Sequence, residues 1–212
     1  IASVLAHVPH FKAAATATPV HIALSYDEEV GCLGAPDLVA EVAAAAVKPA
    51  LCIVGEPTGL RIGYAHKGKV ARRVIVTGRG GHSALPHRAA NAVFAAARIV
   101  TALEDLALRT ASAGRRDAAF DPPYTTIHVG SLHGGTALNF VPDRATLEFE
   151  IRYIPGTDVN ALLGEADAAI AEARQNLRAQ APEADISVEN MASYPALSTA
   201  VASAVVATAQ RL

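Results

Sequence analysis

The chain has 212 residues, 51% of them hydrophobic, and its 18 Lys and Arg against 20 Asp and Glu give a formal net charge of −2. This composition excludes a disordered protein, and it provides no broad basic field for binding nucleic acid or an anionic membrane. Two cysteines cannot build a disulfide-rich secreted scaffold, and the sequence shows neither an apolar run of about 20 residues nor a basic leader, so we expect a reduced, cytoplasmic compartment.

The first part of the chain predicts helices alternating with buried strands. Residues 1–14 are typical of the end of a helix that is broken near Pro9. Short apolar runs at 19–26 and 50–55 predict two buried strands, and the Ala-rich segment 34–46 between them predicts a helix. A β-α-β order with nearly continuous apolar strands favours a parallel sheet covered by helices.

From about residue 64 onwards the pattern changes. Alternating charged and apolar residues at 69–78 predict a half-solvated strand. The elements predicted after it are a helix over 88–109, strands at 125–135 and 144–156, a helix capped by Thr157 or Asp158 and running to about Gln180, and a strand at 185–190. This β-α-β-β-α-β order over 64–190 predicts a ferredoxin-like sandwich.

The strand at 144–156 and the last segment of the chain have patterns of their own. In the strand at 144–156, one face carries four apolar or aromatic side chains, namely Leu147, Phe149, Ile151 and Tyr153. The last segment, 197–212, predicts another helix with Ser198 as its cap.

Acidic residues follow both predicted buried strands: Asp27, Glu28 and Glu29 come after the first, and Glu56 after the second. Sites in open parallel sheets form outside the C-terminal ends of strands, so Glu29 and Glu56 are candidates to converge. Converging carboxylates repel each other, and a divalent cation would keep them ionised. If one of Glu28 and Glu29 binds metal, the other could take a proton from metal-bound water.

Other interpretations of these residues stay open. Residues 25–28 also fit a helix capping box, and Glu56 with the three residues after it could form an ordinary turn. Cys32 could approach a metal, although a buried core thiol is the stronger expectation.

The second part of the chain contains a glycine-rich segment with a histidine, and two further histidines on one predicted strand. The GRGGHS segment at 78–83 lacks the third glycine of a dinucleotide fingerprint, so we interpret it as a tight turn that presents His82. His128 and His133 lie five positions apart on one predicted strand and are expected to face opposite sides of it.

Six motifs occur in order along the chain: YDEEVGCLGA, LCIVGEPTG, AHKGKV, GRGGHSALPHRAANAV, FDPPYTTIHVGSLHGGTALNFVPD and FEIRYIPG. Together, over about residues 20–197, they resemble the dinuclear-metal M20 amidohydrolases. DPPYTT with HGGTALN is most similar to the acetylornithine deacetylase branch. The resemblance implies a fold of the α/β class: a parallel-type catalytic domain, present in part at 1–63 and 191–212, carries an inserted ferredoxin-like lid and dimerisation domain at 64–190.

The resemblance also implies roles for the acidic residues and for His82. Glu28 would be the general base, and Glu29 and Glu56 would each be a ligand of one of two zinc ions, for which cobalt can substitute. His82 would reach the active site of the partner in a homodimer and help to stabilise the tetrahedral oxyanion.

Asn139 and Arg152 match lid residues that hold the carboxylate end of the substrate. An arginine suits this role because its planar fork can bind both oxygens of a carboxylate. Arg152 also lies two positions from Glu150, so a surface ion pair of small energetic value is the alternative.

Other parts of the family pattern are missing from this sequence, namely an upstream His-x-Asp segment, a bridging Asp and a late His. We therefore expect a chain that starts at Ile1 without a Met to be a central portion of a longer protein. Two carboxylate ligands alone would bind metal weakly, because zinc sites normally use three or four protein ligands.

The function implied by the resemblance is hydrolysis of N2-acetyl-L-ornithine, a small N-acyl amino acid, to L-ornithine and acetate in arginine biosynthesis. Two alternatives remain. One is action on another substrate, as a succinyl-diaminopimelate desuccinylase, another N-acyl-amino-acid amidohydrolase or a dipeptidase. The other is a non-catalytic dimerisation or binding module.

Overall fold

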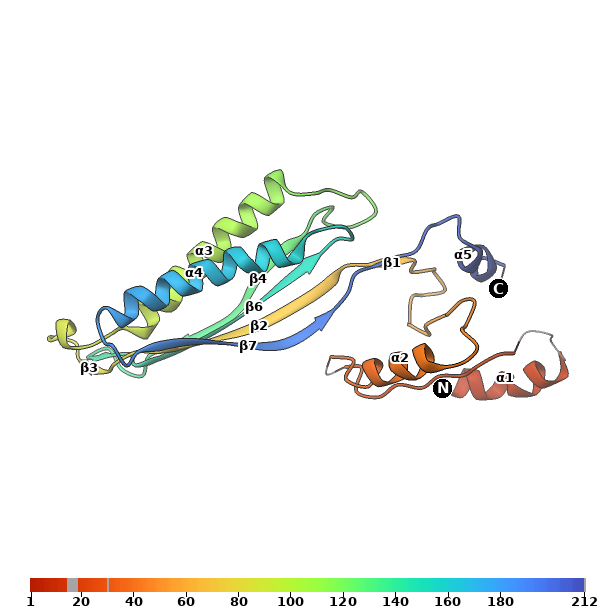
Figure 1. Ribbon diagram of the computed structural model, residues 1–212, viewed down its shortest axis with the longest axis horizontal. Helices are drawn as coiled ribbons and strands as arrows, with labels where there is room; N and C mark the ends of the chain where they lie inside the picture. Colours follow the sequence, from red (N-terminus) through yellow and green to blue (C-terminus); the bar gives the residue numbers. More distant parts are fainter. Residues whose placement is uncertain (15–18, 30, 212) are drawn as a thin grey trace. The chain divides into compact units, whose positions relative to one another are not determined.

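The computed structural model describes residues 1–14, 19–29 and 31–211, and the chain divides into two compact units, Ile1–Cys52 and Ile53–Leu212 (Figure 1). Val30, within the acidic motif, and Leu212, at the end of the expected last helix, lie outside the described residues. Within the described ranges, no helix combines the length and the apolar character that crossing a membrane requires.

The described residues of the first unit form two helices, α1 (Ala2–Ala13) and α2 (Ala35–Ala44). The expectation that the first helix breaks near Pro9 is wrong, because α1 continues through Pro9. A proline inside a helix removes one backbone hydrogen bond and strains the turn before it, yet a helix can continue past it. The helix expected at 34–46 is confirmed as α2, with Asp37 in its first turn.

The strands expected at 19–26 and 50–55 are not formed. Both segments lack regular secondary structure, and their apolar side chains are exposed, with Leu24 at 64% and Ile53 at 57%. A strand needs a neighbour to take up its backbone N–H and C=O groups, and neither segment pairs with any described strand. All ladders among the described residues are antiparallel, so the expected parallel sheet is not present there.

The second unit contains the ferredoxin-like lid expected from the sequence. Its sheet has the strand order β4–β6–β2–β7, formed by β2 (Gly68–Thr77), β4 (Thr126–Gly134), β6 (Arg144–Tyr153) and β7 (Asp185–Tyr194). Helices α3 (Ala92–Ala113) and α4 (Val159–Arg178) join β2 to β4 and β6 to β7, which gives the predicted β-α-β-β-α-β order. Both helices cover the same face of the sheet (Figure 1).

The core of the lid lies between this sheet face and the two helices. Leu147, Phe149 and Ile151 of β6 are buried there, and Tyr153 packs against the same cluster, as the alternation predicted. Leu103 of α3 is buried opposite them. Burying an apolar side chain of this size contributes about 1.5–3 kcal/mol, so this row is a main source of lid stability.

A capping side chain sets the start of α3. The helix begins at Ala92 and not at the expected Arg88, because Oδ1 of Asn91 accepts hydrogen bonds from the backbone N–H groups of Val93 and Phe94, at 2.9 and 3.1 Å. The residues before it form a short 3-10 helix, η1 (Pro86–Arg88).

The later elements follow the sequence prediction in part. Asp158 caps α4, as expected, by accepting a hydrogen bond from the N–H of Ala161 at 3.1 Å. Ser198 does not cap the last helix, because it belongs to β8 (Leu197–Ser198), which pairs with β1 (Ala65–His66). Helix α5 (Ala204–Ala209) begins after Ser203 instead.

A β-bulge at Gly130 changes the alternation of β4. The register shifts there, so that His128 pairs with Glu150 and His133 pairs with Thr146 of β6. Directly paired residues share a face, and both partners lie on the face without helices. The expectation that the two histidines face opposite sides is therefore wrong, because the extra residue restores them to one side.

Candidate functional site

One end of the lid carries both His82 and Asn139. Strand β3 (Gly81–His82) pairs with β5 (Phe140–Val141), which places His82 opposite Phe140. The backbone N–H of Ser83 also donates to the carbonyl oxygen of Asn139 at 3.1 Å. We call this end, formed by β3 and β5, the lid tip; it lies away from β1 (Figure 1).

Close backbone packing holds the turn that presents His82. Arg79 and Ala90 exchange two backbone hydrogen bonds of 2.9 Å each. A Cβ atom at Gly78 would lie 2.1 Å from the carbonyl oxygen of Ala90, and one at Gly80 would lie 2.6 Å from the ring of Phe140. These glycines therefore allow close packing within a tight turn, and the dinucleotide interpretation has no support from the fold around them.

His82 is exposed, and its ring is oriented by a hydrogen bond to the backbone. The N–H of Ala84 donates to Nδ1 of His82 at 3.1 Å. A ring nitrogen that accepts a hydrogen bond carries no proton, so the neutral imidazole has its proton on Nε2. The Nε2–H group can then donate to an oxygen of another molecule.

Arg152 lies at the other end of the same strands. Lys69 pairs with Arg152 and Thr77 pairs with Arg144, close to the lid tip. Arg144 and Arg152 are eight residues apart on one strand, about 27 Å at the rise of an antiparallel strand. Within one copy of the lid, a small substrate therefore cannot contact both Asn139 and Arg152.

Arg152 takes part in a half-buried polar network on the helix-free face of the sheet. Its Nε donates to Glu150 at 2.9 Å, and its Nη1 donates to the hydroxyl of Tyr194 at 2.5 Å. Lys69 Nζ lies 3.2 Å from the other Glu150 oxygen. The ion pair considered from the sequence is thus formed. A guanidinium has five N–H donors, which leaves its Nη2 side for a carboxylate ligand.

The charges in this network shift two pKa values. Burial acts to raise the pKa of Glu150, but hydrogen bonds from Arg152 and Lys69, and their positive charges, outweigh it and hold this pKa below its ordinary value. The hydrogen bond with Glu150 raises the pKa of Arg152, against the opposing effect of burial. Both side chains are therefore held in their charged forms.

A lysine that sequence reasoning did not single out joins two of the motifs. Nζ of Lys67 donates to the carbonyl oxygens of Pro122 and Tyr124, at 2.9 and 2.7 Å. Burial lowers the pKa of Lys67, and the charge of Asp121 opposes that shift. The lysine in AHKGKV thus holds the FDPPY segment beside the start of β2, and its place inside a motif was the available signal.

The acidic candidates are exposed, and they are divided between the two units. Glu28 and Glu29 lie in the first unit, and Glu56 lies in the second. Their convergence stays a prediction. The capping box considered for residues 25–28 is not formed, because α2 begins later, after Gly34.

Local contacts of these residues are weak. The Sγ of Cys32 lies 3.9 Å from Oε1 of Glu28, and the thiol is only partly buried. The carbonyl oxygen of Glu56 accepts from the N–H of Thr58 at 2.9 Å, as in the turn considered from the sequence.

A metal centre is not formed by the described residues alone. Among them, no three His, Cys, Asp or Glu side chains lie close enough together to hold a metal ion. Carboxylates such as Glu29 and Glu56 suit a divalent cation chemically, but zinc normally requires three or four protein ligands, with nitrogen or sulfur among them. The residues that the structure describes therefore do not fit a complete zinc site.

Comparison with known proteins identifies the lid. Residues 64–177 match the family described as peptidase dimerisation domain, M20_dimer. Acetylornithine deacetylase of Myxococcus xanthus is 44% identical over 138 residues, which cover 65% of this chain and 35% of that protein. Acetylornithine deacetylase of Edwardsiella ictaluri is 36% identical over 152 residues, 70% of this chain and 38% of that protein.

One solved structure shares the fold. The crystal structure of aminopeptidase PepT from Bacillus cereus ATCC 10987 has a TM-score of 0.51 at 21% identity, and the match covers 70% of this chain and 35% of that one. At this identity the similarity shows the fold alone. The chain spans little more than a third of the length of the curated relatives that it matches.

Proposed function

Because the chain belongs to the M20 peptidase dimerisation-domain family, we propose that it forms a homodimer through its lid and is part of a metal-dependent amidohydrolase. The proposed reaction is hydrolysis of N2-acetyl-L-ornithine to L-ornithine and acetate. The two acetylornithine deacetylases at 44% and 36% identity support this substrate. In the proposed domain organisation, 64–190 is the lid, and 1–63 and 191–212 belong to the catalytic domain.

The observation that carries the proposal is the lid tip. His82 and Asn139 lie side by side there, and the ring of His82 is exposed with Nδ1 already occupied. A donor that is oriented before the substrate binds can stabilise negative charge as it develops on a carbonyl oxygen. This is the property required of an oxyanion-stabilising residue in amide hydrolysis.

A homodimer accounts for the separation of the lid residues. Arg144, which lies next to the lid tip, is about 27 Å along β6 from Arg152, so one copy cannot bring His82, Asn139 and Arg152 to one substrate. We propose that the lid tip of one copy enters the active site of the other, while Arg152 binds the substrate carboxylate at the site of its own copy.

The chemical roles proposed for this chain are proton transfer and hydrogen bonding. Glu28 would take a proton from the attacking water and return it to the leaving amine. Nε2–H of His82 would donate to the oxyanion. Glu29 and Glu56 remain proposed ligands of two zinc ions, with cobalt as a substitute, and such ions would polarise the scissile carbonyl.

The β4 edge of the lid is the surface proposed for the second copy. The family match at 64–177 includes β4 and ends before β7, the other edge strand. Exposed apolar side chains occur on β4 and on α3, which packs over it; Phe94 is 67% exposed and Leu108 is 62% exposed. An edge strand can pair antiparallel with its own copy about a two-fold axis, which gives a closed dimer.

A substrate panel tests the proposed reaction. The intact protein, supplied with zinc or cobalt, should hydrolyse N2-acetyl-L-ornithine with a higher kcat/KM than N-succinyl-diaminopimelate or a dipeptide. A preference for the succinyl compound would overturn the proposed substrate. A dimer that hydrolyses none of these amides would favour a non-catalytic dimerisation module.

A further inference from the structure

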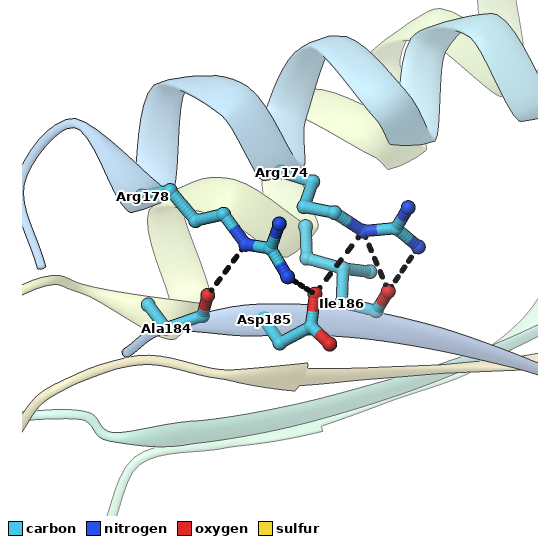
Figure 2. Close-up of polar contacts among 5 residues, drawn as sticks. All are labelled: Arg174, Arg178, Ala184, Asp185 and Ile186. Atoms are coloured by element: carbon cyan, nitrogen blue, oxygen red, sulfur yellow. Dashed lines mark hydrogen bonds and ion pairs between the residues drawn. The ribbon is translucent and has the colours of Figure 1, made fainter. Parts of the chain in front are cut away.

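Two arginine side chains of α4 cover the start of the outer edge of β7, at Ile186 and at Ala184 just before the strand (Figure 2). Nε of Arg174 donates a hydrogen bond to the carbonyl oxygen of Ile186 at 2.9 Å, and its Nη2 contacts the same oxygen. Nε of Arg178 donates to the carbonyl oxygen of Ala184 at 3.1 Å. The two carbonyl groups belong to alternate residues, so they point to the same side of the chain.

Contacts with Asp185 show which side that is. Arg178 and Arg174 lie 2.9 and 3.2 Å from the same carboxylate oxygen of Asp185 (Figure 2). Ile186 is buried under the helices, so its neighbour Asp185 lies on the opposite face of the strand. The arginines start from the helix-covered face, and they must pass over the outer edge of β7 to reach Asp185.

This arrangement obstructs pairing of another strand at the start of the β7 edge. Free carbonyl and N–H groups on an edge strand are a template for a strand of a second chain. An incoming strand at Ala184 and Ile186 would have to displace charge-assisted hydrogen bonds, which are stronger than neutral ones.

The two edges of the sheet differ in this respect. The register shifts in the ladder of each edge strand, β4 with β6 and β7 with β2, so a bulge does not distinguish the two edges. The carbonyl oxygens of Ala184 and Ile186 at the β7 edge accept from arginines, whereas in the described part of the chain no side chain donates to a β4 carbonyl.

We propose that Arg174 and Arg178, by blocking the start of the β7 edge, keep a second copy of this chain from pairing there, so that copies pair only at β4 and assembly stops at two copies. Two open edges would allow pairing to continue from copy to copy, whereas a single edge that pairs about a two-fold axis is used up in the dimer. This inference rests on the proposed homodimer through the lid.

Oligomeric state tests the proposal. The full chain and its Arg174→Ala/Arg178→Ala double variant are compared by size-exclusion chromatography with light scattering over a range of concentrations. We expect two copies for the wild type and a concentration-dependent series of larger species for the double variant. A double variant that stays at two copies, with an unchanged circular dichroism spectrum, would overturn the role of the arginines.

Two matched variants separate edge protection from loss of charge. Arg109→Ala removes an ion-paired arginine from α3, which bonds Glu165 and no strand carbonyl, and should remain at two copies. Asp185→Asn weakens the ion pairs but keeps both arginine–carbonyl bonds, and should also remain at two copies. Larger species in either variant would contradict the proposal.

Hydrogen exchange on the wild type supplies a readout that does not depend on folding of a variant. Dilution below the dimer dissociation constant should increase amide exchange in β4 and leave β7 unchanged. Concentration-dependent protection of β7 would overturn the inference while supporting a homodimer. A wild-type chain that is monomeric at every concentration would refute the proposed homodimer itself.

Discussion

The backbone N–H of Ala84 donates a hydrogen bond to Nδ1 of His82, with 3.1 Å between the two nitrogen atoms. This bond assigns the proton of the neutral ring to Nε2, and it also restricts rotation of the ring. A contact between residues two positions apart therefore determines that His82 presents a donor to any neighbouring molecule.

Replacing His82 by alanine should lower kcat of the intact enzyme by about 100-fold or more, with a smaller change in KM, because the lost hydrogen bond forms mainly in the transition state. Steady-state kinetics with N2-acetyl-L-ornithine measure both constants. His87→Ala, at an exposed histidine of η1, is the matched control and should retain activity. A rise in KM at constant kcat would make His82 a residue that binds the substrate ground state.

Changing Glu28 to glutamine should abolish turnover and leave the metal content of the intact enzyme nearly unchanged, because the amide keeps the shape of the side chain but cannot accept the proton from water. Metal analysis of the same sample used for kinetics measures both effects. Glu41→Gln, an exposed carboxylate of α2, is the control. Near-normal turnover in Glu28→Gln would exclude Glu28 as the base.

Arg152 has two roles to separate, binding of a substrate carboxylate and pairing with Glu150. Arg152→Ala should raise KM at least tenfold if the guanidinium holds the substrate, because a charge-assisted bidentate contact is lost. Arg73→Ala is the matched control, since Arg73 lies on the same sheet face and pairs with Glu148 at 2.8 Å. A loss of stability below about 1 kcal/mol with KM unchanged would leave only the ion pair.

Stability of the lid should depend on pH through Glu150. Its pKa in the folded protein lies below the ordinary value of 4.5, so its contribution is fully present above about pH 4.5 and is lost as the pH falls through the lower folded value. Thermal unfolding from pH 7 to pH 3 should show wild type losing its advantage over Glu150→Gln in that acidic range. An advantage that is constant across the range would contradict this assignment.

The control for the pH series is Glu172→Gln, which removes an exposed carboxylate from α4 without touching the network of Arg152 and Lys69. Its difference from wild type should not reproduce the acidic loss seen with Glu150→Gln.

Loss of the α4 cap should destabilise the lid by about 1 kcal/mol, because Asp158→Ala leaves the N–H of Ala161 without its side-chain acceptor. Urea denaturation followed by circular dichroism measures the difference. Asn160→Ala, in the same helical turn but outside the cap, should change stability by less. Equal effects of the two substitutions would show that the cap has no special contribution.

The long strands and helices of the lid could be predicted from the sequence because each has a local signal, whereas β5 and η1 were not predicted. Alternation at Leu147, Phe149 and Ile151 defined β6, and Asp158 marked the start of α4. The runs at 19–26 and 50–55 have the composition of strands, but strand formation depends on a pairing partner that a local pattern does not reveal.

The candidate site was predictable in its residues and not in its arrangement. The motifs identified His82, Asn139 and Arg152 one at a time. Their distribution between the two ends of the sheet depends on the pairing of β3 with β5 and on the register of β2 with β6. Arginines of α4 that reach the β7 carbonyls have no sequence signal, because arginine on the exposed side of a helix is ordinary.

The extra residue in β4 reverses which residues, odd-numbered or even-numbered, face the helices. Before Gly130 the odd-numbered residues Ile127 and Val129 face the helices, whereas after it the even-numbered Leu132 does so. A single residue thus lets a strand with irregular spacing place all three apolar side chains on one side and both histidines on the other. The position of the extra residue decides which side chains after Gly130 face the helices. Deleting Gly130 would turn Leu132 to the helix-free face and His133 to the helix-covered face.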